Sequence, residues 1–185
     1  KQEQEIEFMG LPSSIVVLSM TREMDYNIRH NICLEALKSI LQTRCMNVIR
    51  EKEGGTYAVN VNQGVVYEPV AQYSMIVEFQ CDPLNAAKLK GIVYGELERL
   101  RQQVPSRDEL MMALNSIRKK EGEARESNVY WQEKLVLYYR TGLNQADVRE
   151  FEEIVDKLTP EDFLEFVREF WENVDITDVV FKPKS

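Results

Sequence analysis

Apolar residues along the chain follow two different spacings, and each spacing predicts one kind of element. Alternation of apolar and polar positions, or a short β-branched run, predicts a strand, whereas apolar residues at every third or fourth position predict an amphipathic helix. Strand patterns occupy residues 13–21, 57–62, 73–81 and 174–181, with a further edge strand around Ile6 and Phe8. The two middle strands, joined by a short connection, are typical of an antiparallel hairpin or meander.

Helical spacing begins at Ile28 and predicts one long amphipathic helix, capped at Asp25 or Asn27 and stopped by Gly54 and Gly55. Five shorter helices are predicted: one opened by Asp82 and Pro83, and four at 106–126, 130–139, 147–158 and 159–171. Strands that pair locally beside segregated helices favour an α+β fold, with helices packed on one face of a mostly antiparallel sheet.

No internal repeat, low-complexity segment or linker divides the sequence, so residues 1–185 are interpreted as a single domain. The length is sufficient for one hydrophobic core. Because the chain opens on Lys1 and not on Met, we expect it to be a fragment of a longer protein.

The composition is that of an ordinary globular domain, with 44% hydrophobic and 29% charged residues. A net charge of -8 disfavours nucleic acid and anionic membranes as partners. The strands between residues 57 and 81 also lack basic residues interleaved with aromatics, which argues against a nucleic-acid-binding sheet. No apolar run approaches the ~18 residues of a spanning helix, so we expect no membrane insertion.

Candidate catalytic groups are few. His30 is the single histidine, whereas an H-x-x-E-H zinc peptidase needs two histidines and an acidic ligand. The chain therefore cannot be a self-sufficient zinc peptidase. Cys33, Cys45 and Cys81 show no C-x-x-C spacing and are interpreted as buried small hydrophobes. Neither a G-x-S-x-G elbow nor a phosphate-binding glycine loop is present in the sequence.

The segment I-R-E-K-E-G-G-T-Y at 49–57 joins the long helix to the first alternating strand. In the plainest interpretation, Arg50 is a cation at a helix C-terminus, and Tyr57 is a strand aromatic. The segment also resembles one at this place in the carboxy-terminal domains of bacterial pitrilysin/insulinase-type metallopeptidases. There an Arg ends the long helix and a Tyr follows after Gly. F-Q-C-D-P at 79–83 and L-T-P-E-D-F at 158–163 are similar to further segments of that family, so the resemblance covers nearly the whole chain.

The resemblance implies the fold of a mitochondrial processing peptidase-like metallohydrolase domain, within a two- or four-domain peptidase. It implies no cofactor in this chain, and Zn²⁺ on a homologous zinc-bearing domain of the same protein or complex. Tyr57 would be catalytic, as a hydrogen-bond donor to the developing oxyanion. Arg50, Tyr57, Gly54 and Gly55 would bind the peptide substrate.

The location implied for bacterial members is the cell envelope or periplasm, or else the cytoplasm, and the residues alone leave the compartment open. An alternative is an inactive scaffold or interaction domain of the same fold. In either case a neighbouring domain would bury ~600–1,500 Å² against this one, so we expect an exposed apolar surface on the chain.

Overall fold

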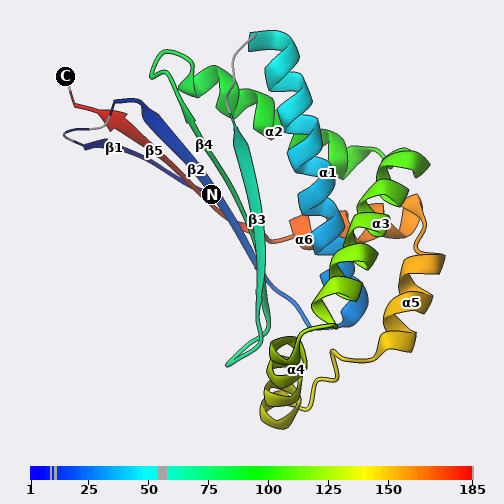
Figure 1. The fold of residues 1–185 in the computed structure, drawn as a ribbon. Helices are drawn as coiled ribbons and strands as arrows, with labels where there is room; N and C mark the ends of the chain where they lie inside the picture. Colours follow the sequence, from blue (N-terminus) through cyan, green and yellow to red (C-terminus); the bar gives the residue numbers. More distant parts are fainter. Residues whose placement is uncertain (9, 11, 54–57, 185) are drawn as a thin grey trace.

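The structure, a computed structural model, describes residues 1–8, 10, 12–53 and 58–184, with the backbone alone for 50–53. The strands are β1 (Gln2–Phe8), β2 (Ser14–Glu23), β3 (Val59–Val66), β4 (Gln72–Cys81) and β5 (Asp175–Pro183). The helices are α1 (Ile28–Glu53), α2 (Ala86–Gln102), α3 (Arg107–Ala124), α4 (Asn128–Thr141), α5 (Val148–Lys157) and α6 (Pro160–Trp171). Figure 1 shows the sheet as one layer and the helices gathered on one side of it.

The sheet has the strand order β1-β5-β2-β4-β3. Three pairings are antiparallel, and only the terminal pair of β1 with β5 is parallel among the described strands. The predicted hairpin is confirmed as β3 and β4, in which Val61 lies opposite Val77. The α+β class, with helices packed on one face of a mostly antiparallel sheet, is likewise confirmed.

The core lies between the sheet and the helices because each element presents one apolar row to this layer. On β2, Val16, Leu18 and Met20 are buried, while the residues between them are partly exposed. Helix α1 crosses the middle of the layer and buries a row that runs from Ile32 to Ile49. The helix is capped by Asn27, whose side-chain oxygen accepts a hydrogen bond from the His30 N–H at 2.7 Å.

One predicted helix start is wrong by several residues. Helix α2 begins at Ala86 and not at Pro83. Asp82 instead stabilises a turn: its carboxylate accepts from the Leu84 N–H at 2.8 Å, and its carbonyl accepts from the Asn85 N–H at 2.9 Å. An Asp-Pro pair favours such a turn as readily as a helix start, because both use the fixed φ of proline.

Three further predicted starts agree with side-chain capping in the structure, whereas α4 begins two residues before its predicted start at 130 and is capped by Ser127. Ser106 with Glu109, and Thr159 with Asp162, form the capping boxes of α3 and α6, and Asp147 caps α5. Among the described residues, no helix is both long enough and apolar enough to cross a membrane.

The two edges of the sheet differ. At the β3 edge, the Val59 N–H donates to Met46 Sδ at 3.3 Å, and the Val61 N–H donates to Gln42 Oε1 at 3.4 Å. Side chains of α1 therefore occupy donors that an edge strand would otherwise leave free. At the opposite edge, every residue of β1 is exposed, so β1 is the open edge.

The face of the sheet turned away from the helices is apolar near β1. Ile15 lies opposite Phe181, which pairs in turn with Ile6, and Val17 lies opposite Val179. These side chains point away from the core because their neighbours on the strands point into it. We call these five residues the open sheet face.

Candidate functional site

The predicted site lies where α1 ends and β3 begins. Arg50 lies in the last turn of α1, as predicted, and its side chain is outside the described residues. Gly54, Gly55 and Tyr57 also lie outside the described residues. The substrate contacts assigned to these four residues therefore stay predictions.

The described residues on both sides of this connection are fixed in the core. Ile49, one residue before Arg50, is fully buried. Val59, two residues after Tyr57, is buried, pairs with Phe79 on β4 and donates its N–H to Met46 of α1. The helix end and the strand start are thus held together, at the end of the sheet's covered edge.

His30 lies at the opposite end of α1. With a helical rise of 1.5 Å per residue, it is roughly 30 Å from Arg50 along the helix. The imidazole packs between Tyr73 and Phe166, with ring centroids 6.2 and 5.5 Å away, and its Nε2 lies 3.7 Å from a Glu169 carboxylate oxygen. It is a partly packed helix residue. Within the described ranges, no three His, Cys, Asp or Glu side chains are grouped so as to hold a metal ion.

The three cysteines are buried free thiols, which confirms their interpretation as small hydrophobes. Burial raises the pKa of Cys33 and of Cys45 to about 12, and it also raises the pKa of Cys81. A thiol with such a pKa is protonated at neutral pH, so none of the three is poised as a nucleophile.

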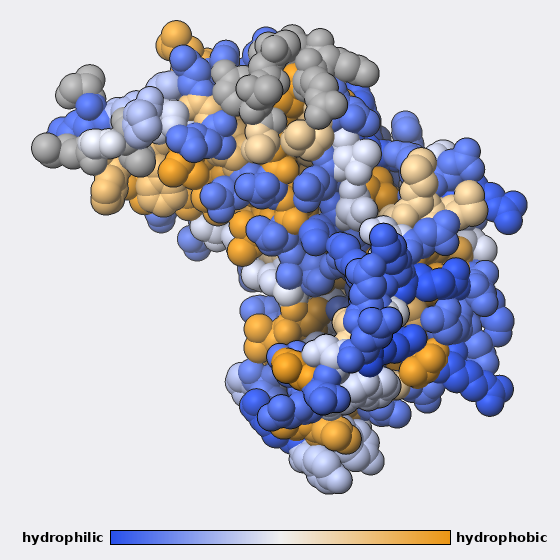
Figure 2. Space-filling model, viewed as in Figure 1, coloured by the Kyte–Doolittle hydropathy of each residue, from blue (hydrophilic) through white to orange (hydrophobic). Residues whose placement is uncertain are grey.

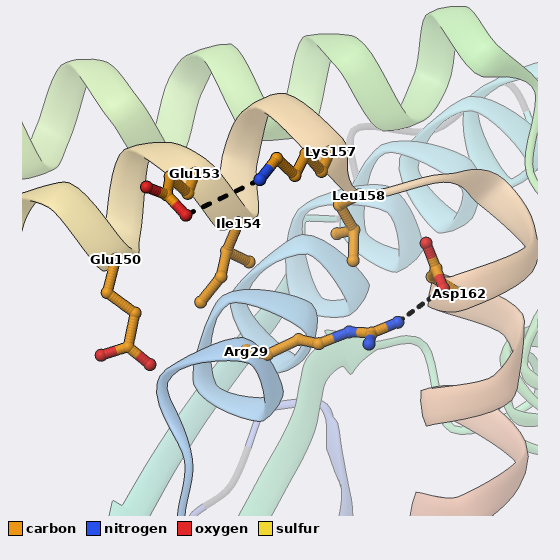
Figure 3. A pocket seen from close by; sticks show the side chains of 7 residues that line it. All are labelled: Arg29, Glu150, Glu153, Ile154, Lys157, Leu158 and Asp162. Carbon is orange, nitrogen blue, oxygen red and sulfur yellow. Dashed lines mark hydrogen bonds and ion pairs between the residues drawn. The ribbon is translucent and has the colours of Figure 1, made fainter.

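A pocket of about 250 Å³ opens between the start of α1, helix α5 and the start of α6 (Figure 3). Arg29 reaches across it to Asp162, with 2.6 Å between Nη2 and Oδ1, and Lys157 lies 3.6 Å from Glu153. The Thr159 N–H and hydroxyl also donate to Asp162, and these contacts are the main reason that the pKa of Asp162 is lowered. The pocket lies at the opposite end of α1 from Arg50. Its charged groups form two ion pairs, Arg29 with Asp162 and Lys157 with Glu153, so we assign them to holding the helices together.

Sequence reasoning missed a polar pair inside the helix layer. Gln63 occupies an inward position of β3, in the same row as Val59 and Val61, and its Nε2 donates to Glu35 of α1 at 2.7 Å. Two signals in the sequence could have found this pair: a polar residue at an inward position of a strand, and a second polar residue on the inner side of a helix. Both residues line a second cavity.

Comparisons with known proteins agree with this fold. A family model described as "Peptidase M16 inactive domain" matches residues 1–117. A curated relative, a zinc protease PQQL-like protein of Arabidopsis thaliana, is 22% identical over 121 residues, which are 63% of this chain and 13% of that protein.

Two solved structures have a similar fold over nearly the whole chain. The periplasmic protease PqqL from Escherichia coli has a TM-score of 0.83 at 18% identity, covering 99% of this chain and 20% of that one. A peptidase M16 inactive domain from Pseudomonas fluorescens has a TM-score of 0.76 at 18% identity, covering 100% of this chain and 44% of that one. The chain thus spans a small part of the two proteases and less than half of the third protein.

Proposed function

The chain belongs to the peptidase M16 inactive-domain family, and on this premise we propose that it is the substrate-binding, zinc-free half of a metallopeptidase. The other half is a homologous zinc-bearing domain of the same protein or complex. The observation that supports this most directly is the position of Arg50. It lies in the last turn of α1, just before the connection to β3, and within residues 1–117 that the family model matches. The described residues of this chain offer no ligand set for zinc, so the metal is assigned to the partner domain.

Each residue of the connection has a distinct chemical task in this proposal. A zinc ion held by the partner domain would supply the Lewis acid that lowers the pKa of the attacking water. The Tyr57 hydroxyl donates a hydrogen bond to the oxygen on which negative charge develops. Arg50 stays charged throughout and presents a planar fork of donors to substrate carbonyl groups. Gly54 and Gly55 lack a Cβ, which lets the peptide approach the backbone closely.

The open sheet face is suited to receive the partner domain. Its five side chains are apolar, they share one face, and none of the described helices covers them. Figure 2 shows hydrophobic atoms in orange over the strands at the left of the view. The chain spans only a part of its relatives, so further domains can lie beside it. A neighbouring domain typically buries an uncovered apolar surface of this kind.

Helix α4 offers a second apolar surface for the same partner, since it has no buried residue. Trp131, Leu135, Tyr138 and Tyr139 are exposed and follow the spacing i, i+4, i+7, i+8 of a helix that packs against a groove or sheet. Polar contacts attach α4 to the body: the Trp131 Nε1–H donates to the Arg125 carbonyl at 2.8 Å, and Tyr130 hydrogen-bonds Glu121. We call the exposed residues Trp131, Leu135, Tyr138 and Tyr139 the α4 stripe.

The decisive experiment is peptide hydrolysis by the full-length protein, measured beside its zinc content and repeated with Tyr57→Phe. A zinc-containing enzyme whose kcat falls in this variant supports the proposal. A full-length protein that neither holds zinc nor cleaves peptides would instead be the inactive scaffold of the same fold.

A further inference from the structure

We propose that the outer edge of β1 binds an extended segment of a separate polypeptide chain, in which basic and apolar residues alternate, as a sixth strand of the sheet. β1 is the terminal strand of the order β1-β5-β2-β4-β3, and all of its residues are exposed. Figure 1 shows it at the end of the sheet farthest from α1. The inference goes beyond the function proposed above and does not depend on it.

The backbone of β1 leaves one set of hydrogen-bonding groups free. The Phe8 carbonyl accepts from the Lys184 N–H at 3.2 Å, so Phe8 directs its backbone groups toward the β5 side. Backbone groups of successive strand residues point to opposite sides, so the N–H and C=O groups of Glu3, Glu5 and Glu7 point outward. In the described part of the chain, no strand pairs with this outer side of β1. It is therefore a template for one more strand.

The side chains of β1 determine which strand fits. Ile6 belongs to the open sheet face, and Phe8 lies on the same side of the strand. Glu5 lies opposite the buried Val180, so the three glutamates of β1 are on the other side, toward the helices. Residues opposite one another on neighbouring strands share a face and interact. A partner strand should thus place cations opposite the glutamates and apolar side chains opposite Ile6 and Phe8, where they widen the open sheet face.

The three carboxylates remain accessible to the cations of a partner. Lys1 lies 2.6 Å from Glu3 and Lys182 lies 2.8 Å from Glu5, whereas Glu7 has no ion pair among the described residues. Both pairs are largely exposed to solvent, and such pairs contribute little to stability, so a lysine of the partner can join or replace them. The net charge of -8 adds a general attraction for a basic segment.

A second copy of this chain fits the edge poorly. Antiparallel pairing of two β1 strands would place the glutamates of both copies on one face and opposite each other, and like charges directly opposite are destabilising. Charged side chains on an edge strand commonly prevent such self-pairing. A basic strand turns the same charges into attractions, so the glutamates select the partner.

Calorimetric titration of the full-length protein can test the edge with an acetylated and amidated heptapeptide in which valine and lysine alternate, beginning and ending with valine. Two isomers carry the same charge: one is N-methylated on its lysines, the other on its valines. Strand addition uses the N–H groups of only one set, the lysines in an antiparallel pair and the valines in a parallel pair. One isomer should bind like the parent, and the other at least about tenfold more weakly, as expected from two or more lost hydrogen bonds. Equal binding of the two isomers, or no binding of the parent peptide, would overturn the proposal.

A peptide of the same length with glutamate in place of lysine tests the charge preference. Its backbone can pair with β1 equally well, but its carboxylates lie opposite the three glutamates of the strand. We therefore expect it to bind at least about fivefold more weakly than the parent peptide. The same affinity for both peptides would contradict the assignment of a basic partner.

Variants place the binding on β1. Glu5→Pro removes one outward N–H, a change that an edge strand tolerates where that N–H faces solvent, and it should weaken binding of the parent peptide at least about tenfold. Glu5→Gln is the matched control: it keeps the N–H, loses only the charge and should weaken binding about threefold at most. An unchanged Kd in Glu5→Pro would show that the peptide binds elsewhere. Melting curves show whether Glu5→Pro folds, and the N-methylated isomers test the edge in the unmodified protein.

Discussion

The backbone N–H of Val61 on the edge strand β3 donates to the side-chain oxygen of Gln42 on α1, at 3.4 Å. With the neighbouring contact between Val59 and Met46, this closes the start of β3 to any added strand. An extended peptide arriving at the connection before β3 therefore cannot extend the sheet there through these two N–H groups. It would have to be held by side chains, and the edge left open for strand addition is β1.

Gln42 should stabilise the fold through that contact. In Gln42→Leu, the buried Val61 N–H loses its acceptor, and we expect the free energy of unfolding to fall by ~1–2 kcal/mol. Gln42→Glu keeps an acceptor at the same place and is the matched control. Urea unfolding monitored by circular dichroism measures both variants. Equal stability of Gln42→Leu and the wild type would show that Val61 does not depend on Gln42.

Tyr57→Phe in the full-length enzyme should lower kcat about 100-fold or more with little change in KM. A donor that acts on the developing oxyanion is used mainly in the transition state. Steady-state hydrolysis of a fluorogenic peptide measures both constants. Tyr94→Phe is the control for loss of a hydroxyl, because its hydroxyl donates to Asp178 at 3.2 Å, away from the proposed machinery. An unchanged kcat in Tyr57→Phe would remove Tyr57 from the catalytic assignment.

Leu135→Asp should weaken binding of this chain to its zinc-bearing partner by at least about tenfold. The side chain lies in the α4 stripe, where docking would bury a charge. Stability of the isolated chain should change little, since Leu135 is exposed in it. Sedimentation velocity with the separately produced partner domain reports the affinity. Met112→Asp, at an exposed position of α3, should bind normally; a similar loss in both variants would argue against a specific role for α4.

The ion pair of Arg44 with Glu109 should make stability depend on acid pH. Arg44 contacts both carboxylate oxygens, at 2.8 and 2.9 Å, and its hydrogen bond is the main cause that lowers the Glu109 pKa below its usual 4.5. Because the folded-state pKa is the lower one, the stabilisation is present above pH 4.5 and is lost as the pH falls below it. Glu109 is partly exposed, so the contribution is at most about 1 kcal/mol.

Urea unfolding between pH 7 and pH 3 in the wild type and in Arg44→Met tests this dependence. The difference in stability between the two should shrink as the pH falls below 4.5. Arg149→Met is the control, because Arg149 forms an exposed pair with Glu153. A difference that stays constant over the whole range would show that Arg44 acts through packing alone.

Local patterns in the sequence determined the elements and most of their ends. Alternation along β4 and helical spacing along α1 each depend on a few neighbouring residues. The first identified the buried row of β4 correctly, and the second identified most of the α1 row but took Val48 for the buried Ile49 at its end. Capping boxes such as Ser106 with Glu109 are equally local. The roles of Arg50 and Tyr57 came from resemblance alone, and they stay predictions because the structure describes neither side chain.

Only the tertiary structure decided features that depend on distant segments. Gln2 pairs with Thr177 across almost the whole sequence, and this pairing places β1 at the open edge. Gln63 and Glu35 are ordinary polar residues until β3 packs on α1 and encloses their contact in a cavity. Strand pairing and burial between elements arise from the packing of the whole chain, so no short window of sequence encodes them.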